Sequence, residues 1–264
     1  PDDCDLGDVN CDGELNVLDV VLMVNMILED EYDEIADVNE DGSLNVLDVV
    51  ILVNLILDNI PNDTVTDIDG NVYETIQIGE QLWMAENLKV THYNNGEEIP
   101  NITNNEDWVS LSTGAYGDYD NNPTNSETYG RLYNWYTVDD SRGLCMEGWH
   151  VPSDEEYTVL KDYLGGTSVA GGKMKEAGLE HWNYYSDEIT EEATNESGFT
   201  GLPAGYRASY SGAYYDVGNL CSFWSSSEYN SSYAWYRLLT YSYSNVHRYY
   251  YHKLYGFSIR CLGD

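Results

Sequence analysis

Basic residues are scarce in this sequence. There are 11 Lys and Arg against 47 Asp and Glu, a formal net charge of −36, and none of the 11 precedes Lys89. Because nucleic acid and anionic membranes repel such a chain, we expect neither as a partner. Long apolar runs are absent as well: the stretch Val17–Leu28 is interrupted by Asp19 and Asn25 and is too short to span a bilayer.

The motifs of common enzymes are also missing. There is no HExxH, no GxSxG and no Gly-rich phosphate-binding loop. Carboxylates are so abundant that a pair of them, as glycosidases use, does not discriminate between functions. We therefore expect a protein that is not an enzyme.

Zinc-ribbon spacing is absent among the five cysteines. We expect disulfides Cys4–Cys11 and Cys145–Cys261, with Cys221 free, and hence an extracellular or cell-surface protein. Five reduced thiols are the alternative. No signal peptide is recognisable, and we interpret the start of the chain as processed or trimmed.

A twelve-residue segment of the N-terminal region, residues 8–19, returns with an offset of 29 residues as residues 37–48. Oxygen ligands at loop positions 1, 3 and 5 wrap a hard cation, Gly at position 6 permits a sharp turn, and position 12 closes the shell. Here position 12 is Asp rather than the Glu of an EF-hand. The alternative is a pair of Asx-rich turns. The predicted ligands of two Ca²⁺ are Asp8, Asn10, Asp12, Glu14, Asn16, Asp19, Asp37, Asn39, Asp41, Ser43, Asn45 and Asp48.

Each loop leads into an apolar helix, predicted over residues 16–28 and 45–57, but no helix precedes either loop. This duplicated pattern resembles a type I dockerin module over roughly residues 3–60. The resemblance implies an all-α module with antiparallel helices, calcium-dependent folding, and docking into a cohesin domain. At the positions where the family contacts cohesin, this chain has Val17, Leu18, Val46 and Leu47. We expect them to meet a cohesin-like partner or the downstream domain of the same chain.

The composition changes after a short polar break, so we expect a module over 1–60, a linker over 61–66 and a second domain over 67–264. The sequence predicts a strand over 72–78, preceded by a hairpin turn at Asp69-Gly70-Asn71. Ser153 and Glu156 form a capping box that opens a helix over 154–164, and a weaker helix covers 170–177. Few helices among many short strands indicate an α+β domain.

Several segments of this domain are distinctive, and they appear in the order "DIDGNVYETIQIGEQLWMAENL", "YGRLYNWYTV", "GLCMEGWHVPSDEEYTVL", "GFTGLPAGYR", "FWSSSEY" and "GFSIRC". They resemble the Fibrobacter major paralogous domain over residues 65–262, which implies a C-type-lectin-like fold related to the formylglycine-generating enzyme. The resemblance supports the Cys145–Cys261 disulfide. We interpret Trp149, Trp224, Trp235 and His150 as framework. The catalytic cysteine pair of the enzyme relatives and the sugar-binding motifs of C-type lectins cannot be matched here.

Tyrosine is concentrated near the C-terminus. Thirteen of the 25 Tyr lie in residues 206–255, and residues 229–255 are mainly Tyr and Ser, without Gly, Pro, Asp, Glu, Gln or Met. Tyr offers a large contact area at low entropic cost and Ser offers adaptable hydrogen bonds, as in antibody paratopes. This composition predicts a ligand-binding surface.

Relatives of the domain are often Asn-rich in this stretch, and at many of its positions this chain has the residues that adenine substitution yields from Asn codons. Trp235, Arg237, Arg248, Gly256, Ser258 and Arg260 match the framework instead. The chain therefore resembles the variable protein of a diversity-generating retroelement, which implies a non-enzymatic display protein that binds a protein or cell-surface ligand. Cys221 would then be an accident of mutagenesis. The predicted ligand-binding residues are Tyr210, Tyr214, Tyr215, Leu220, Tyr233, Leu238, Thr240, Ser242, Tyr243, His247, Tyr249, Tyr250, Tyr251, His252 and Leu254.

Three alternatives to retroelement display remain. The surface could be a Tyr-rich sheet that binds nothing in particular, or the domain could be a generic extracellular binding module. The dockerin-like module could instead carry a component of a polysaccharide-degrading or carbohydrate-binding complex.

Overall fold

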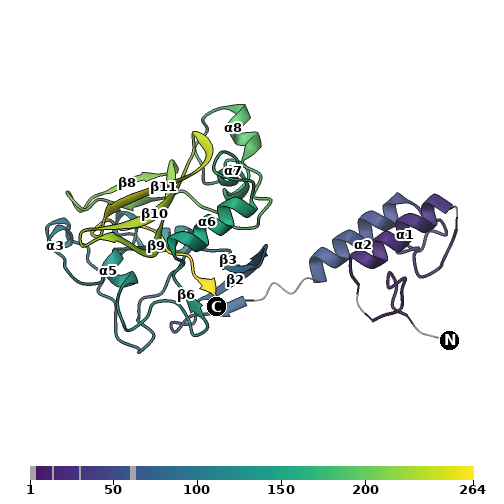
Figure 1. Cartoon of the computed structure of the whole chain (residues 1–264), viewed down its shortest axis with the longest axis horizontal. Helices are drawn as coiled ribbons and strands as arrows, with labels where there is room; N and C mark the ends of the chain where they lie inside the picture. The colour runs from purple at the N-terminus through teal and green to yellow at the C-terminus, as the bar shows by residue number, and fades with distance from the viewer. Residues whose placement is uncertain (1–3, 14, 30, 60–63) are drawn as a thin grey trace. The chain divides into compact units, whose positions relative to one another are not determined.

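The computed structural model describes residues 4–13, 15–29, 31–59 and 64–264, with residues 57–59 described by their backbone. The chain divides into two compact units, residues 1–62 and 63–264 (Figure 1). Residues 61–63 of the predicted linker lie outside the described part. Residues 64–66 of that linker instead form a strand of the second unit, so the predicted boundary at 67 is wrong.

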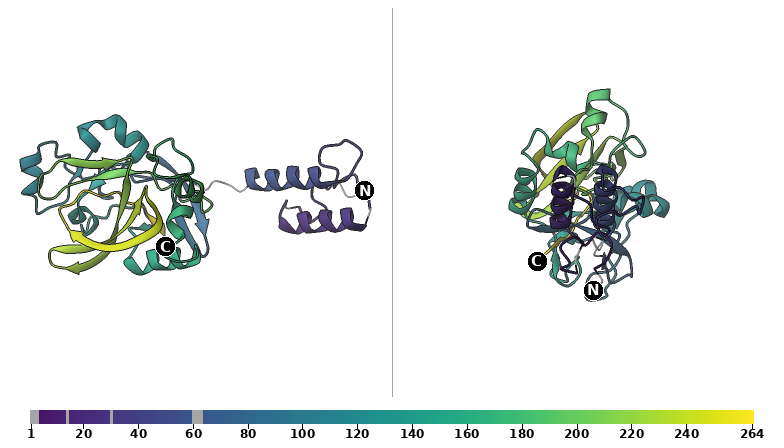
Figure 2. Two further views of the ribbon diagram at one scale, coloured as in Figure 1. Left: turned by 90° about the horizontal axis from the view of Figure 1, so that it is seen from above. Right: turned by 90° about the vertical axis from the view of Figure 1, so that its right-hand side faces the viewer.

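The N-terminal unit contains two helices, α1 (Val17–Glu29) and α2 (Val46–Asn59). They lie side by side and antiparallel (Figures 1 and 2). Both begin one residue later than predicted, because Asn16 and Asn45 act as caps: their side-chain oxygens accept the N–H groups of Leu18 and Leu47 at 2.8 and 2.9 Å. The fully buried core of this unit is small and consists of Met23, Ala36, Val38 and Leu52.

One sheet of the C-terminal unit joins the two ends of the unit. Its strand order is β1-β2-β3-β12-β6, so the first strands along the chain and the last strand share a sheet. The predicted turn joins β1 to β2, with the Gly70 N–H donating to the Asp67 carbonyl at 3.0 Å. The strands are β1 (Thr64–Thr66), β2 (Val72–Ile78), β3 (Gln81–Met84), β6 (Trp149–His150) and β12 (Leu262–Gly263).

The second sheet has the order β11-β10-β9-β7-β8, in which β9, β10 and β11 form an antiparallel meander with β11 at the edge. Strand β7 runs parallel to β9, with Gly205 opposite Cys221. The strands are β7 (Ala204–Arg207), β8 (Tyr214–Val217), β9 (Leu220–Asn230), β10 (Tyr233–Thr240) and β11 (Tyr243–His252). A third, small sheet pairs β4 (Tyr116–Gly117) with β5 (Leu132–Tyr133).

Helix α6 (Asp154–Tyr163) begins where predicted, and both hydrogen bonds of its Ser153–Glu156 capping box are formed. Helix α7 (Ala170–Met174) is shorter than predicted, because Lys175 is extended and forms a bridge with Gly201. Five short helical segments were not predicted, although Asn or Ser caps four of them. These segments are α3 (Asn105–Val109), η1 (Tyr119–Asn121), α4 (Pro123–Tyr129), α5 (Trp135–Val138) and α8 (Asp187–Glu192).

Two large clusters of buried side chains fill the C-terminal unit, one around Trp224 and Phe257 and the other around Trp83 and Phe199. Buried guanidinium groups connect loops through backbone carbonyls. Arg260, which is fully buried, donates to the Asn87 side chain at 2.7 Å and to the carbonyls of Met84, Phe199 and Thr200. The unit is therefore a mixed α/β domain with two curved sheets.

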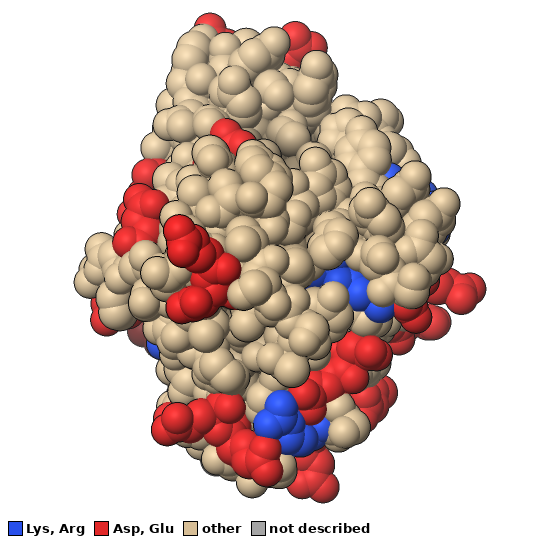
Figure 3. Space-filling view, turned by 90° about the vertical axis from the view of Figure 1, so that its left-hand side faces the viewer, with Lys and Arg blue, Asp and Glu red and all other residues tan. Residues whose placement is uncertain are grey.

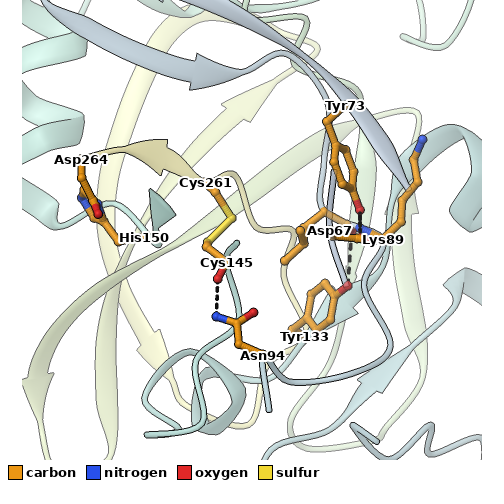
Figure 4. The surroundings of a disulfide bond; sticks show 10 residues. Asp67, Tyr73, Lys89, Asn94, Tyr133, Cys145, His150, Cys261 and Asp264 are labelled. Carbon is orange, nitrogen blue, oxygen red and sulfur yellow. Dashed lines mark hydrogen bonds and ion pairs between the residues drawn. A yellow bond between two sulfur atoms is a disulfide. The ribbon is translucent and has the colours of Figure 1, made fainter. Parts of the chain in front are cut away.

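The structure contains disulfides Cys4–Cys11 and Cys145–Cys261, the two pairs expected from the sequence. Cys145–Cys261 ties the loop before β6 to the segment before β12 (Figure 4). Nearby, the His150 ring bonds to Asp264 at 2.7 Å and to Glu156 at 3.0 Å. These two hydrogen-bond partners give His150 the structural role expected from the sequence.

Candidate functional site

The two N-terminal loops have nearly the same geometry. In the first, Asp8 accepts the N–H groups of Asp12 and Gly13 at 3.1 and 2.9 Å, and in the second Asp37 accepts those of Asp41 and Gly42 at 3.2 and 2.8 Å. Both loops place their fourth residue, Cys11 or Glu40, at a φ of 56°. The repeat seen in the sequence is therefore a repeat in space.

The last residue of each loop closes it from the start of the helix. Asp19 accepts the N–H groups of Asn10 and Asn16 at 3.2 and 2.9 Å, and Asp48 accepts those of Asn39 and Asn45 at 3.3 and 2.8 Å. Each of these hydrogen bonds of the first loop thus has a counterpart in the second. Glu14, predicted as a ligand through its carbonyl, lies outside the described residues.

Four carboxylates of these loops are buried: Asp8, Asp19, Asp37 and Asp48. Residues 1–62 contain no Lys or Arg to compensate their charge. A buried charge is costly unless it is paired or coordinates a metal ion. Carboxylate and amide oxygens are also the ligands that calcium prefers, so the residues present fit the ion.

The helices of this unit leave an apolar surface exposed. Val17 and Val46 are 67% and 70% exposed, and Leu18 and Leu47 are 57% and 52% exposed. These predicted docking residues occupy equivalent positions in the two repeats, at the start of each helix. The structure therefore leaves the four side chains free for a partner.

The C-terminal unit carries a continuous series of aromatic side chains on one side of its second sheet. On β10 and β11, Tyr236 lies opposite Tyr249 and Leu238 opposite His247, so these side chains share a face. Neighbouring ring centroids along the series are 4.3–6.5 Å apart, within the range of favourable ring contacts. We call this surface the aromatic face; in spatial order it consists of Tyr243, His247, Tyr249, Tyr236, Tyr251, Tyr255, Tyr206, Tyr215 and Tyr210.

Six members of the aromatic face were predicted as ligand-binding residues, whereas Tyr206, Tyr236 and Tyr255 were missed. Tyr236 and Tyr255 are only 6% and 7% exposed and form the floor on which the exposed rings pack. Tyr206 lies on β7, Tyr236 on β10 and Tyr255 on the segment after β11. Their role follows from this assembly and has no separate signal in the sequence.

Other predicted residues lie elsewhere. Tyr233, Tyr250 and His252 point to the opposite side of the β10–β11 hairpin, where Tyr250 stacks on Tyr229 at 3.9 Å. Tyr214 turns away from the aromatic face, because its hydroxyl bonds to Asn121 at 2.9 Å. The predicted residues therefore form two surfaces rather than one.

Leu254 was predicted as a ligand-binding residue and Cys221 as a position changed by mutagenesis, but both are buried. Leu254 lies below the surface, and its carbonyl accepts the indole N–H of Trp108 at 3.0 Å. Cys221 lies in the core on β9, where burial raises the pKa of its thiol to about 12. These two positions are corrections to the prediction.

A pocket of about 190 Å³ opens in the middle of the aromatic face. Leu220, Ser222 and Leu238 line it from the sheet, together with Tyr206, Asp216, Tyr236, Tyr251, Tyr255 and Phe257. Burial, followed by the nearby charge of Asp216, raises the pKa of Tyr206 to about 12. Burial also raises the pKa of Tyr236 and Tyr255. These phenols are therefore neutral at physiological pH, and Asp216 supplies the charge among the residues that line the pocket.

A second hollow of about 700 Å³ lies between α6 and β11. Asp154 at the start of α6 binds Arg237 at 2.5 Å and Arg248 at 2.8 Å, so the hollow is crossed by ion pairs. Burial of Asp154 would raise the pKa of its carboxyl, but hydrogen bonds from Arg248 and Arg237 outweigh burial and lower it. Asp154 and the two arginines are mutually paired and hold α6 against the sheet.

Within the part of the chain that the structure describes, one group of acidic and His side chains has ligand atoms within 4.8 Å of one another: Glu176, Glu180 and His181. The His181 ring already bonds to both carboxylate oxygens of Glu176, at 2.8 and 3.0 Å. We read this group as a surface ion pair.

The end of the C-terminal unit that carries α3 and β8 is mostly neither acidic nor basic (Figure 3). Asp and Glu gather mainly around its periphery, and Lys and Arg appear at few points. This neutral region contrasts with the large negative charge of the whole chain.

Comparison with known families agrees with both units. Residues 76–262 match the Fibrobacter succinogenes major domain, and residues 6–57 match the dockerin type I domain. The chain belongs to the Fibrobacter succinogenes major domain family. No curated protein and no solved structure gave a significant match.

Neither of the two families is catalytic, and the function of the Fibrobacter succinogenes major domain is unknown. Type I dockerin domains bind calcium, typically dock into cohesins, and occur in extracellular cellulosome components. Among the described residues no helix is long and apolar enough to cross a membrane.

Proposed function

We propose that this chain is a non-enzymatic extracellular or cell-surface protein that binds a ligand through the aromatic face. The continuous series of nine rings around a pocket is the observation that carries the proposal. Tyr rings bury large areas with few rotatable bonds, which suits a recognition surface. The dockerin unit, holding two Ca²⁺, attaches the protein to a cohesin-like partner.

The aromatic face is, in this proposal, diversified by a retroelement on a C-type-lectin-like fold. Support comes from the position of six residues that adenine substitution can generate: Tyr210, Tyr215, Tyr243, His247, Tyr249 and Tyr251 all lie on it. The buried framework residue Trp224 lies between the variable positions in sequence, and its ring packs against Tyr236 of the face at 6.1 Å. Arg260, which follows the variable positions, is buried as well. The pairing of the unit's first and last strands within one sheet supports the lectin-like fold.

Sequencing of the gene in many descendants of one clone tests diversification. We expect adenine-derived substitutions at the codons of the six face residues and none at the codons of Trp224 and Arg260. A near-copy of the same stretch should lie close to a reverse-transcriptase gene. Substitutions spread evenly over the domain, or no near-copy, would rule out the retroelement part of the proposal.

A recombinant type I cohesin tests the attachment function. Because Leu18 and Leu47 are exposed at equivalent positions, Leu18→Asp together with Leu47→Asp should abolish calcium-dependent binding in calorimetry. Leu28→Asp is the matched control, since Leu28 is 78% exposed but lies at the other end of α1. Equal losses in the double variant and the control would contradict docking through the helix starts.

The dockerin match also favours a second candidate, a carbohydrate-binding component of a surface complex. This function predicts that the full chain is retained on microcrystalline cellulose. Tyr210→Ser together with Tyr249→Ser should then reduce retention, whereas Tyr163→Ser, at an exposed Tyr of α6, should not. Absence of retention for the native chain would exclude this candidate for cellulose.

A further inference from the structure

The pocket in the aromatic face differs from the rest of that face in being both concave and charged. Its floor is Phe257, 2% exposed, and its walls include Tyr206, Tyr236 and Tyr255. The rings of Tyr236 and Tyr255 lie 4.7 and 5.6 Å from Phe257, so the walls are packed against the floor. The pocket is therefore a built cavity that does not depend on one mobile side chain.

Asp216 brings a carboxylate to the edge of this pocket. Its backbone has a φ of 65°, a left-handed conformation within β8, two residues before the turn that leads to β9. The Asn219 N–H donates to the Asp216 carbonyl at 3.0 Å, and the Asn219 side chain donates to the carboxylate at 3.4 Å. The first contact fixes the backbone of the turn and the second reaches the carboxylate itself. No Lys or Arg is among the residues that line the pocket.

We propose that the pocket binds an alkylammonium group, namely a lysine side chain presented by the protein ligand. The electron-rich faces of Tyr rings attract a cation within about 6 Å of the ring centroid, and a neighbouring carboxylate adds direct charge attraction. The volume of about 190 Å³ corresponds to roughly six water molecules at about 30 Å³ each, enough for a four-carbon chain and its ammonium. This inference rests on the proposed function, because it names the ligand group taken by part of the aromatic face.

The charge of the whole chain favours the same ligand class. A net charge of −36 attracts cationic partners over long range and repels anionic ones. An uncharged apolar side chain of the same length would fill the pocket but would cover the Asp216 carboxylate without pairing it, which is unfavourable. The pocket should therefore bind a positively charged side chain more tightly than an uncharged side chain of the same shape.

Two small probes separate charge from shape. We would titrate Nα-acetyl-lysine amide and Nα-acetyl-norleucine amide into the calcium-loaded full chain and follow the Tyr ring signals by NMR. We expect saturable binding of the lysine probe, about tenfold tighter than the norleucine probe, as a cation–π site with one carboxylate predicts. Added salt should weaken only the lysine probe.

Variants test whether Asp216 and the pocket walls are responsible. Asp216→Asn should reduce lysine-probe affinity about fivefold or more and leave the norleucine probe unchanged, because Asn keeps the left-handed turn but removes the charge. Asp120→Asn is the matched control: Asp120 is also exposed and has a φ of 54°, but it lies outside the pocket. Tyr206→Leu should weaken the lysine probe while keeping an apolar wall.

Equal affinity for the two probes, no binding of the lysine probe, or equal losses in Asp216→Asn and Asp120→Asn would overturn the inference. These results leave the proposed function standing. That function is tested by the locus sequencing and by cohesin binding of the Leu18 and Leu47 variant, and neither of these two residues lines the pocket. If the sequencing test failed but the lysine probe still bound, diversification by a retroelement would be excluded and the assignment of the pocket to a lysine side chain would stand.

Discussion

The buried charges of the N-terminal unit are acidic, whereas those of the C-terminal unit are mainly basic. Asp8, Asp19, Asp37 and Asp48 are buried in a unit without Lys or Arg. In the C-terminal unit the buried side chains of Arg207, Arg237, Arg260 and Lys175 reach backbone carbonyls or Asp154. The first unit therefore has no Lys or Arg to pair with its buried carboxylates, whereas the second supplies partners for its buried cations.

The hydrophobic core is also smaller in the N-terminal unit than in the C-terminal unit. Among its described residues the N-terminal unit has four buried apolar side chains, while two extensive clusters of aromatic and aliphatic residues fill the C-terminal unit. A small core contributes little stability against the entropy of ordering the chain. We therefore expect calcium to supply much of the stability of the first unit, as our proposal implies, and packing to supply that of the second.

Removal of calcium should give the largest contrast. With excess EGTA we expect the N-terminal unit to lose α1 and α2, 13 and 14 residues, while the C-terminal unit stays folded. Far-UV circular dichroism should report the helix loss. Tryptophan fluorescence should stay constant, because all seven Trp lie in the C-terminal unit.

Two loop variants refine this prediction. Asp19→Asn and Asp48→Asn should each lower the number of bound Ca²⁺ from two to one in calorimetry, because each removes the carboxylate that closes one loop. Glu40→Gln, an exposed loop acid at a position that does not bind the ion, should still bind two. If α1 and α2 persisted in EGTA, the expected difference between a calcium-dependent N-terminal unit and a C-terminal unit stabilised by packing would be wrong.

The two disulfides should differ in their effect on stability. Cys145–Cys261 joins residues 116 apart, and chain-entropy estimates give about 4.7 kcal/mol for a loop of about 100 residues. Cys4–Cys11 joins residues only 7 apart, so the same relation gives about 2 kcal/mol. Urea unfolding of the paired Cys→Ser variants, followed by fluorescence and by circular dichroism, checks the order. A larger effect of the short loop would show that calcium alone does not hold the first unit.

Asp154→Asn should destabilise the C-terminal unit by about 3 kcal/mol, since it leaves the guanidinium of Arg237, 2% exposed, without its anion. Asp162→Asn is the control on the same helix, because its carboxylate is 61% exposed and its ion pair with Lys161 contributes little. Urea unfolding measured by fluorescence gives both values. Equal effects would mean that packing, and not internal charge pairing, dominates this unit.

A smaller effect concerns Lys175, whose pKa burial lowers from 10.5 to about 8. Between pH 8 and 10 the unfolded chain keeps a proton on this Lys that the folded chain has released. The free energy of unfolding should therefore rise with pH over this interval. Lys175→Met should remove the rise, as measured by urea titrations at three pH values. A rise of equal size in the variant would assign it to another group.

The features that sequence reasoning predicted depend on residues close together in the chain. The calcium loops, the α6 capping box and the Asp69-Gly70-Asn71 turn each need twelve residues or fewer, and the structure has all three conformations. The strand β2 has the predicted bounds because its alternating residues face the core and solvent. The four unpredicted short helices with Asn or Ser caps also have a local sequence signal, namely the capping residue directly before each helix.

The composition of the C-terminal stretch by itself indicated a recognition surface, but tertiary structure decided which residues form it. The pleat of β11 sends Tyr249 and Tyr250 to opposite sides, and only the register with β10 determines which side joins Tyr236. Leu254 and Cys221 are buried because segments from far along the chain cover them. The pocket requires β7, β9, β10 and the segment after β11 to meet, because its walls and its charge come from residues that the sequence keeps apart.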